Sequence, residues 1–286
     1  MRTDPRLTPA RDDLAAASLE GLVPAGRYVR PRRMQVSVPA TAVRSQPDAS
    51  AEQWDQLLLG ERFDVLEIRD GFAWGQAVRD GYVGHVALDA LAPEGPAPTH
   101  WVRVRLTYGF RSPSIKSEPV GPISLNSLVR VSGREGKLVL CDAGFWLPET
   151  HLAPIGVFEA DPVAVAEAHL GAAYLWGGRE GSGLDCSGLV QQALLACGRA
   201  CPRDSDLQQG LGVAASPDAL GRGDLVFWKG HVAMMVDATR MVHANAHHMA
   251  VAIEPLAEAI QRISGMGGGE PTAFRRPFER RRLETD

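Results

Sequence analysis

The sequence contains no long apolar run, no recognisable targeting segment and few cysteines. No stretch reaches the length of about 18 apolar residues that a membrane-spanning helix needs. The N-terminus is charged from its second residue on, without the apolar core and cleavage site of a secretory signal. The net charge of −4 provides no basic stripe for nucleic acid and no polybasic membrane surface. These absences predict a cytoplasmic protein that binds neither nucleic acid nor membranes.

The four cysteines exclude a disulfide framework in a chain of 286 residues. Cys197 and Cys201 have Cys-x-x-x-Cys spacing, but no second pair completes a structural zinc site. Cys141 and Cys197 are predicted to be small buried apolar residues. Only Cys186 lies in a context that indicates chemistry.

The length favours two or three domains, because domains usually hold roughly 100–200 residues. With 45% hydrophobic and 22% charged residues, a full-sized core can form. We predict an N-terminal arm over residues 1–30 with a short helix at 12–22. Two small β-barrels should follow over residues 31–96 and 97–156, and a mixed α+β domain over 157–286.

The two β-barrels are predicted from short β-prone runs that alternate with turn dipeptides such as Asp70-Gly71. The expected strands cover residues 34–38, 62–68, 73–78 and 83–86 in the first barrel, and 102–107, 127–132, 137–141 and 144–147 in the second. Both regions end alike, with Ala-Leu-Ala-Pro at 90–93 and His-Leu-Ala-Pro at 151–154. We interpret this likeness as an internal duplication of one β-module.

The pattern becomes helical after Asp161-Pro162, where proline suits a first helical turn. A second helix is expected over residues 187–197, ended by Gly198. Strands are expected at 225–228, 232–236 and 241–244. The Arg-rich tail from Ala273 on is predicted to be a solvated terminal segment.

The strongest signal is a glycine-rich loop that leads into an apolar helix with Cys186 in its first turn. A free cysteine, with a pKa of about 8.5, is mostly thiol at neutral pH, whereas the thiolate is the nucleophile. Unpaired N–H groups and the positive end of the helix dipole stabilise a thiolate and can also hold an oxyanion. Cys186 is therefore predicted to be a nucleophile of lowered pKa.

A cysteine nucleophile needs a base, and two histidines are placed to provide one. His231 opens a predicted strand and His243 lies in the next, joined by a short polar turn. If the turn centres on Asp237, the two histidines face each other across the ladder. One imidazole would act as base, and the other would fix its tautomer and orientation.

A metal site is a weaker interpretation of the same region. His243 and His247 have a spacing that would face one way on a helix, but the local sequence indicates a strand followed by a loop. No carboxylate or cysteine in the sequence pattern completes a ligand set. We therefore expect neither a metal nor a cofactor.

These motifs resemble the NlpC-type cell-wall peptidases, a papain-like family. The resemblance rests on Tyr-Leu-Trp-Gly-Gly at 174–178, Asp-Cys-Ser-Gly at 185–188, Pro-Arg-Asp-Ser-Asp-Leu-Gln at 202–208, Gly-Asp-Leu-Val-Phe at 223–227, His-Val-Ala at 231–233, and His243. It covers residues 160–265, with Ala173 and Ala233 in place of a usual proline and glycine. The two β-barrels resemble, more weakly, the bacterial SH3 domains that are often attached to these peptidases.

The resemblance implies a papain-like α+β domain preceded by two SH3-like β-barrels. It also implies a γ-D-glutamyl-L-diamino acid endopeptidase acting on peptides derived from peptidoglycan (murein peptides). Such enzymes cut the stem L-Ala-γ-D-Glu-diamino acid between D-Glu and the diamino acid, and they require a free N-terminal L-Ala. In a cytoplasmic protein this activity would serve the recycling of wall fragments.

Several further residues follow from the resemblance or lie beside the nucleophile. Asp185 is expected to pair with the substrate ammonium, to cap the helix, or to do both. The Tyr174 hydroxyl is a candidate second oxyanion donor. The remaining candidate substrate-binding residues are Ser187, Asp204 and Ser205 as polar contacts, Trp176 as a wall of the cleft, and Tyr82 and Glu52 on the first barrel at the amine end.

Two other classes of function remain open from the sequence. One is another cysteine amidase or acyltransferase on the same scaffold, which would not depend on a free amine. The other is a non-catalytic wall-binding protein that uses its SH3-like barrels. Such a protein would be expected to lose the cysteine or a histidine, whereas this chain keeps Cys186, His231 and His243.

Overall fold

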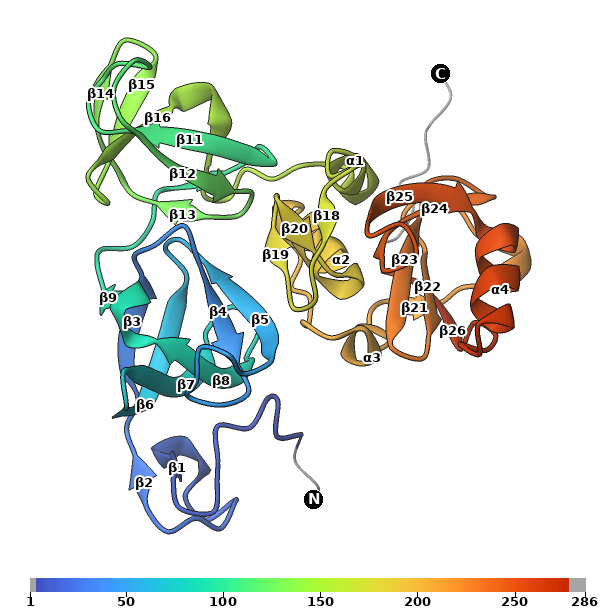
Figure 1. Ribbon diagram of the computed structural model, residues 1–286, viewed down its shortest axis with the longest axis horizontal. Helices are drawn as coiled ribbons and strands as arrows, with labels where there is room; N and C mark the ends of the chain where they lie inside the picture. Colours follow the sequence, from blue (N-terminus) through green and yellow to red (C-terminus); the bar gives the residue numbers. More distant parts are fainter. Residues whose placement is uncertain (1–3, 278–286) are drawn as a thin grey trace. The chain divides into compact units, whose positions relative to one another are not determined.

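The computed structural model describes residues 4–277, which fold into two compact units (Figure 1). Unit 1 comprises Met1–Phe158 together with the loop Trp176–Ser182. Unit 2 comprises Glu159–Leu175 and the chain from Gly183 on. The loop Trp176–Ser182 therefore packs with unit 1, although its neighbours in sequence on both sides belong to unit 2.

The first β-module of unit 1 is an antiparallel sheet of seven strands in the order β5-β4-β8-β7-β6-β3-β9. Its strands are β3 (Arg32–Val36), β4 (Ala40–Arg44), β5 (Gln53–Leu58), β6 (Arg62–Arg69), β7 (Phe72–Ala77), β8 (Val83–Ala87) and β9 (Leu91–Pro93). Alternate side chains such as Val43, Phe63 and Val86 form a closed core. Strands β4 and β5 were not expected from the sequence.

The N-terminal arm lacks the predicted helix over residues 12–22. A short parallel pair of strands, β1 (Ala15–Ala16) and β2 (Tyr28–Val29), flanks a single 3-10 turn at Ala17–Leu19. The fully buried Leu14 packs against Trp74 and Val83 of the first module. This tertiary contact outweighs the weak helical preference of the segment.

The second β-module follows with a core of its own, formed by residues such as Val102, Ile123 and Leu147. Its strands are β10 (His100–Val102), β11 (Leu106–Phe110), β12 (Pro119–Ser124), β13 (Leu128–Val129), β14 (Val131–Glu135), β15 (Leu138–Cys141), β16 (Phe145–Pro148) and β17 (Leu152–Pro154). They form one sheet of five strands and one of three. Each module closes with a 3-10 turn, Leu88–Ala90 or Glu149–His151, that leads into a Leu-Ala-Pro strand.

Unit 2 is built on a mainly antiparallel sheet in the order β20-β18-β25-β24-β23-β22-β26-β21. Its strands are β18 (Ala173–Tyr174), β20 (Gly183–Leu184), β21 (Val213–Ala214), β22 (Leu225–Trp228), β23 (His231–Met235), β24 (Arg240–Asn245), β25 (Ala250–Pro255) and β26 (Ala273–Arg276). Its helices are α1 (Pro162–Glu167), α2 (Cys186–Ala196), α3 (Ser205–Gln208) and α4 (Leu256–Gly265), with a 3-10 turn at Pro217–Ala219. The two-residue strand β19 (Arg179–Glu180) lies in the loop that belongs to unit 1.

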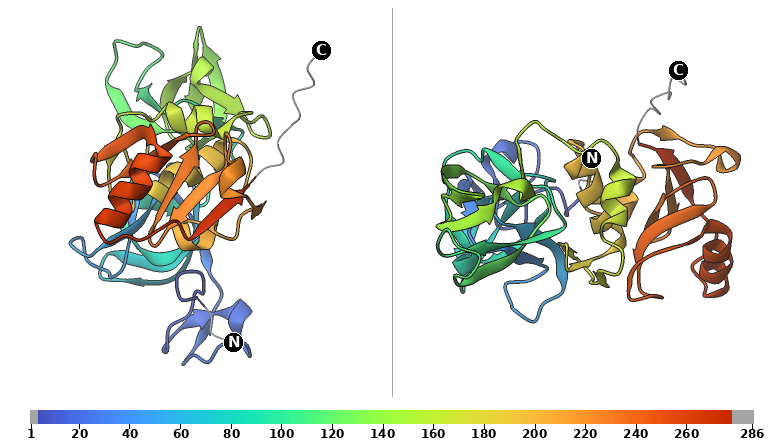
Figure 2. Two further views of the ribbon diagram at one scale, coloured as in Figure 1. Left: turned by 90° about the vertical axis from the view of Figure 1, so that its right-hand side faces the viewer. Right: turned by 90° about the horizontal axis from the view of Figure 1, so that it is seen from above.

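Helices cover both faces of the central strands of unit 2 (Figures 1 and 2). Phe227 and Met234 face α1 and α2 in one core cluster. Their sequence neighbours Trp228 and Met235 face the apolar side of α4 in another. Because both faces are buried, these strands are continuous apolar runs rather than alternating ones.

Two parts of unit 2 differ from the sequence expectations. Strand β25 and helix α4 were not expected. Residues Ala273–Arg276 were predicted to be solvated, yet they form β26, which pairs with β22 and β21, and Arg276 binds Asp224 at 2.7 Å. The rest of the tail, from residue 278 on, lies outside the described residues.

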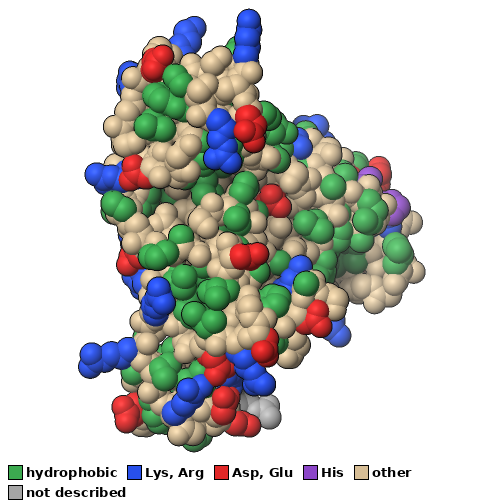
Figure 3. Space-filling model, turned by 60° about the vertical axis from the view of Figure 1, so that its left-hand side comes forward, with side chains coloured by type: hydrophobic (Ala, Val, Ile, Leu, Met, Phe, Trp, Pro, Cys, Tyr) green, Lys and Arg blue, Asp and Glu red, His purple; other side chains and the backbone are tan. Residues whose placement is uncertain are grey.

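The surface is consistent with the near-balanced composition. On the face shown in Figure 3, basic and acidic side chains are interspersed, without a broad field of one sign. None of the helices between residues 4 and 277 is long and apolar enough to cross a membrane.

Candidate active site

Cys186 is the first residue of α2, as the sequence predicts, and Asp185 is the N-cap. The Asp185 carboxylate accepts a hydrogen bond from the Gly188 backbone N–H at 2.7 Å, which satisfies one of the unpaired donors of the first turn. The Ser187 hydroxyl donates to the same carboxylate oxygen at 3.2 Å. The candidate nucleophile therefore stands at a well-capped helix terminus.

The protonation state of Cys186 differs from the prediction. Its side chain is only 7% exposed, and burial, together with the negative charge of Asp185, raises the pKa of the thiol to about 12. The Val232 and Ser187 backbone N–H groups donate toward the sulfur and oppose this rise. The predicted lowering by the helix terminus is wrong for this resting state, because desolvation outweighs it. A nucleophilic role for Cys186 therefore requires a base that removes the thiol proton.

His231 and His243 lie side by side, and His231 Nε2 is 2.8 Å from His243 Nδ1. The other ring nitrogen of His243, Nε2, is 2.7 Å from Glu254 Oε1, and Arg262 binds that same carboxylate oxygen. Neither the carboxylate nor the guanidinium was singled out from the sequence. The structure thus extends the predicted histidine pair into a chain of four polar side chains.

The hairpin register differs slightly from the one expected. Met234 pairs with Val242, so the strand of His243 is displaced by two residues from the arrangement that would set it directly opposite His231. A displacement of two keeps both imidazoles on the same face of the sheet. Their rings therefore still meet, diagonally, with centroids 5.0 Å apart.

Both imidazoles are neutral at physiological pH. Burial, reinforced by His243, lowers the pKa of His231 to about 3. Burial also lowers the pKa of His243, against the opposing effect of Glu254. Burial would raise the pKa of Glu254, but its contacts with His243 and Arg262 lower it overall, so it stays a carboxylate. A neutral His231 can accept the thiol proton, and the Glu254 charge favours the resulting imidazolium.

Tyr174 lies on β18, half-buried against the core that contains Cys186. Burial and the nearby Cys186 and Asp185 raise the pKa of its phenol to about 12. The hydroxyl therefore keeps its proton and remains a hydrogen-bond donor. This is the property that its predicted oxyanion role requires.

Asp185 is more heavily engaged than the sequence suggested. The buried Arg203 donates to both of its carboxylate oxygens, at 3.0 and 2.5 Å, and to the Ser187 hydroxyl at 2.9 Å. Gln208 donates to the Ser187 carbonyl at 3.0 Å and to the Pro202 carbonyl at 2.9 Å. A substrate ammonium could reach Asp185 only by sharing a carboxylate that already has a cation.

Arg203 and Gln208 were missed as site residues, although both stand in the Pro-Arg-x-Ser-x-x-Gln motif. The other two predicted residues of that motif open helix α3. Asp204 is its N-cap without a side-chain capping bond, and Ser205 is its first residue and is buried. The motif thus holds the start of α2 in place as well as offering polar groups.

The remaining predicted site residues belong to unit 1. The Trp176 indole N–H donates to Glu52 Oε1 at 3.1 Å, and the Trp176 side chain is 58% exposed. Tyr82 is buried in the core of the first β-module, and its backbone N–H donates to Asp80 at 3.1 Å. The structure brings Glu52 and Trp176 together, whereas the substrate role of all three stays a prediction.

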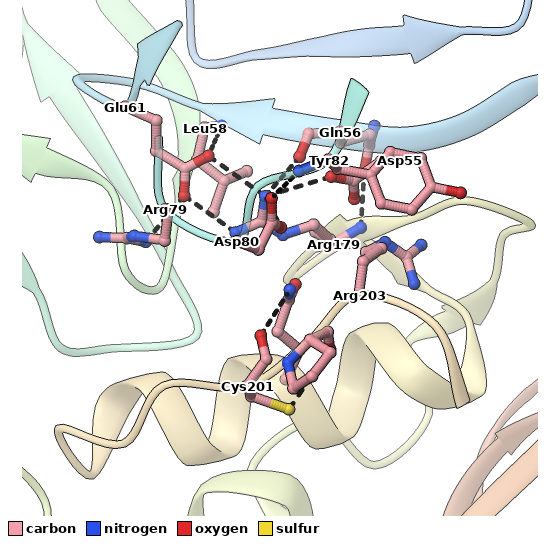
Figure 4. A network of polar contacts seen from close by, with 12 residues as sticks. Asp55, Gln56, Leu58, Glu61, Arg79, Asp80, Tyr82, Arg179, Cys201 and Arg203 are labelled. Carbon is pink, nitrogen blue, oxygen red and sulfur yellow. Dashed lines mark hydrogen bonds and ion pairs between the residues drawn. The ribbon is translucent and has the colours of Figure 1, made fainter. Parts of the chain in front are cut away.

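The loop Trp176–Ser182 is held in unit 1 by a buried ion cluster (Figure 4). The Arg179 guanidinium donates to Glu61 at 2.9 and 3.2 Å and to the Gln56 carbonyl at 2.7 Å. The carboxylates of Asp55 and Asp80 lie 3.6 and 3.7 Å from it. This anchor, which no sequence motif indicated, fixes the loop that follows Tyr174 and Leu175.

A candidate metal ligand set also involves His243, but not the residue considered from the sequence. Among the described residues, ligand atoms of His243, His248 and Glu254 lie within 4.8 Å of one another. His247, the predicted partner, is not part of this group. The β-hairpin turn presents the second histidine of the His247-His248 pair instead of the first.

Cys186 starts a helix and accepts a hydrogen bond from the Val232 backbone N–H, and the preceding residue, His231, is linked through His243 to Glu254. This arrangement suits thiol-dependent hydrolysis. Comparison with known proteins agrees with this chemistry. Residues 171–264 match the NlpC/P60 family, and residues 43–91 match the bacterial dipeptidyl-peptidase Sh3 domain. The chain therefore contains an NlpC/P60 domain at residues 171–264 and a bacterial SH3 domain at residues 43–91.

Two curated relatives each match about a third of this chain. A gamma-D-glutamyl-L-lysine dipeptidyl-peptidase of Bacillus cereus is 36% identical over 104 residues, covering 34% of this chain and 31% of that protein. Dipeptidyl-peptidase 6 of Lysinibacillus sphaericus is 34% identical over 102 residues, covering 35% of this chain and 38% of the relative. The matches thus span only about a third of these relatives.

The likeness in fold extends beyond residues 171–264. An NlpC/P60 family protein from Bacillus cereus superimposes with a TM-score of 0.74, covering 87% of this chain and all of that one. At 21% identity this likeness concerns the fold alone.

Proposed function

We propose that this protein hydrolyses the amide bond between γ-D-Glu and the diamino acid in murein peptides that carry a free N-terminal L-Ala. The proposal depends chiefly on one observation: His231, which precedes the Val232 N–H that reaches the Cys186 sulfur, is linked through His243 to Glu254. The printed activity of the Bacillus cereus relative, gamma-D-glutamyl-L-lysine dipeptidyl-peptidase, supports the choice of bond. Peptides with a free L-Ala are fragments already released from the glycan, so the activity would serve wall recycling.

In the first half of the reaction, His231 removes the thiol proton as the Cys186 sulfur attacks the γ-D-Glu carbonyl carbon. The carbonyl oxygen becomes an oxyanion, which backbone N–H groups near Cys186 and the Tyr174 hydroxyl would stabilise. When the intermediate collapses, the C–N bond breaks. The diamino acid leaves as an amine, taking the proton from the His231 imidazolium, and a thioester remains.

In the second half, His231 removes a proton from water as the water oxygen attacks the thioester carbonyl. The C–S bond breaks, the sulfur recovers the proton, and L-Ala-γ-D-Glu leaves with a new carboxyl group. In both halves the imidazolium is transient, and the Glu254 carboxylate, acting through His243, lowers its energy. No redox step or external cofactor enters this sequence.

The finer architecture belongs to the same proposal. We propose that unit 2 with its loop is a papain-like α+β domain, and that residues 97–156 form a second SH3-like barrel descended from the first by duplication. Support comes from the 3-10 turn and the Leu-Ala-Pro strand that close both β-modules. Asp185 would act mainly as the cap of α2, with any substrate ammonium sharing its carboxylate with Arg203.

The test is to incubate the wild type and Cys186→Ala with L-Ala-γ-D-Glu-meso-diaminopimelate and to follow release of the diamino acid by mass spectrometry. We expect turnover by the wild type and none by the variant, because no other group here can form the thioester. The N-acetylated peptide serves as the substrate control and should not be cut. Turnover of the acetylated peptide would favour a general amidase, and turnover by Cys186→Ala would exclude the mechanism.

A further inference from the structure

His248 stands next to the histidine–carboxylate pair but takes no part in the proposed reaction. It lies in the turn between β24 and β25, and its side chain is exposed. Ligand atoms of His248, His243 and Glu254 lie within 4.8 Å of one another. Two imidazoles and a carboxylate, with one position open to water, are the donor set of many zinc sites in proteins.

Both histidines are oriented as metal ligands usually are. In His248, Nδ1 is 2.9 Å from the Asn245 side-chain oxygen, which can only accept, so Nδ1 carries the proton and Nε2 keeps its lone pair. In His243, Nδ1 is occupied by His231, and Nε2 is the atom that faces Glu254. A hydrogen bond at the remote nitrogen fixes the tautomer and direction of a ligating imidazole.

We propose that His243, His248 and Glu254 form a reversible binding site for a divalent cation of the zinc type, and that its occupation switches the catalytic base off. The binding part stands independently of the reaction, whereas the inhibitory part rests on the proposed function. Neighbouring donors around a tetrahedral zinc lie about 3.3 Å apart, given bonds of about 2.0–2.1 Å. The ion would therefore draw the exposed His248 inward and separate His243 from Glu254 slightly.

The net charge around the three ligands favours binding of a cation only weakly. Glu254 supplies one negative charge, and Arg262, paired with it, partly offsets that charge. The Arg262 side chain is 20% exposed, so it can move toward solvent when a cation takes its place. These features predict a weak, exchangeable site rather than a permanent structural one.

The inhibition follows from the positions of two protons. Without the ion, His243 Nε2–H donates to Glu254, so His243 Nδ1 accepts a proton from His231 Nε2–H. His231 Nδ1 is then unprotonated and can accept the thiol proton. This assignment of tautomers comes from the hydrogen-bond network, in which Glu254 can only accept.

Binding of the ion reverses both tautomers. Because His243 Nε2 must offer its lone pair to the metal, its proton moves to Nδ1, which then donates to His231 Nε2. His231 in turn carries its proton on Nδ1, the atom that has to accept one from the thiol. The two imidazoles carry two protons before and after the ion binds, so no proton is released. His231 can nevertheless no longer act as a base toward the thiol.

The binding arm of the test uses Cys186→Ala, so that the thiol cannot bind the metal, and titrates it with Zn²⁺ by calorimetry. We expect one ion per chain. Adding His248→Gln should weaken binding at least tenfold. Adding His247→Gln should change it less than twofold, because His247 is an exposed neighbour outside the ligand set. Equal binding by the His248→Gln protein would overturn the proposed site.

The inhibition arm measures cleavage of the tripeptide against Zn²⁺ concentration in proteins that retain Cys186. Without metal, His248→Gln should keep kcat within about twofold of the wild type, and its inhibition should need at least tenfold more Zn²⁺. If His248→Gln loses Zn²⁺ binding in the calorimetry but is inhibited by the same Zn²⁺ concentration as the wild type, the inhibitory switch is overturned. The binding site itself would still stand. If no protein cleaves the peptide, the proposed function fails, while the calorimetry still decides the site.

Discussion

Two buried arginines, one in each unit, precede and follow Cys186 in the sequence, and each holds its segment of the chain through a different kind of ion pair. Arg179 of unit 1 binds Glu61, a residue 118 positions away in sequence, within a cluster of several carboxylates. Arg203 of unit 2 binds Asp185, only 18 positions away, in a bidentate pair. The first arginine joins distant segments of the chain, whereas the second sets the cap of one helix. Two equally buried arginines thus have different structural roles. Arg179 joins distant segments of unit 1, and Arg203 fixes the N-terminus of one helix in unit 2.

The largest effect is expected from Arg179→Met. This change leaves Glu61, Asp55 and Asp80 buried with less positive charge, which should cost about 3–5 kcal/mol of the free energy of unfolding. Urea unfolding of the full chain measures the loss. The control is Arg69→Met, since Arg69 is an exposed residue that pairs with the exposed Asp70 and should change stability by less than about 0.5 kcal/mol. Wild-type stability in Arg179→Met would mean that the cluster does not anchor the loop.

A smaller effect is expected from Arg203→Lys. Lysine keeps the charge but cannot donate to both oxygens of Asp185 and to Ser187 at once, so about 1–3 kcal/mol of stability should be lost. The matched control is Arg222→Lys, an exposed residue of the same unit that pairs with Asp161 and Glu167. Thermal unfolding compares the two variants. Equal, negligible shifts would show that the bidentate geometry around Asp185 adds nothing.

The smallest effect concerns the influence of the Arg203 charge on the pKa of the Cys186 thiol. The Arg203 charge lowers the pKa of the Cys186 thiol by less than burial and the charge of Asp185 raise it, so this pKa stays near 12. The thiolate fraction should then rise about tenfold per pH unit from pH 7 to 9 without a plateau. The rate of Cys186 alkylation by iodoacetamide, with Cys186→Ala as background, measures this. A plateau in the alkylation rate below pH 8 would contradict this expectation. It would show that the pKa of Cys186 is lowered, as the helix terminus alone predicts.

The site motifs were predictable because they are local. Cys186 opens a helix whose cap, glycines and apolar face all lie within a few residues, and the two histidines lie in one hairpin. The hairpin register was off by two residues, since turn geometry, not the spacing of polar residues, sets it. The prediction that His231 and His243 lie side by side is confirmed, because a register shift of two residues leaves both side chains on the same face of the sheet.

The parts that were not predictable depend on contacts between distant segments. Strand β5 was missed because Asp55 and Gln56 interrupt its apolar pattern, and both are buried polar residues beside Arg179. Glu254 gave no signal because it is one carboxylate among many until β25 pairs with β24. The thiol pKa was mispredicted because desolvation depends on the whole core, which a local motif does not reveal.

The loop Trp176–Ser182 has a consequence for how such proteins can change over generations. A gene fusion that transferred the sequence from Glu159 onward would carry Arg179 away from Gln56 and Glu61, leaving its guanidinium without the acceptors that accompany it here. Recombination is therefore expected to preserve the first β-module and the peptidase sequence as one inherited block. In this chain, the segment that would have to be moved intact therefore extends beyond residues 171–264, the part that matches the NlpC/P60 family.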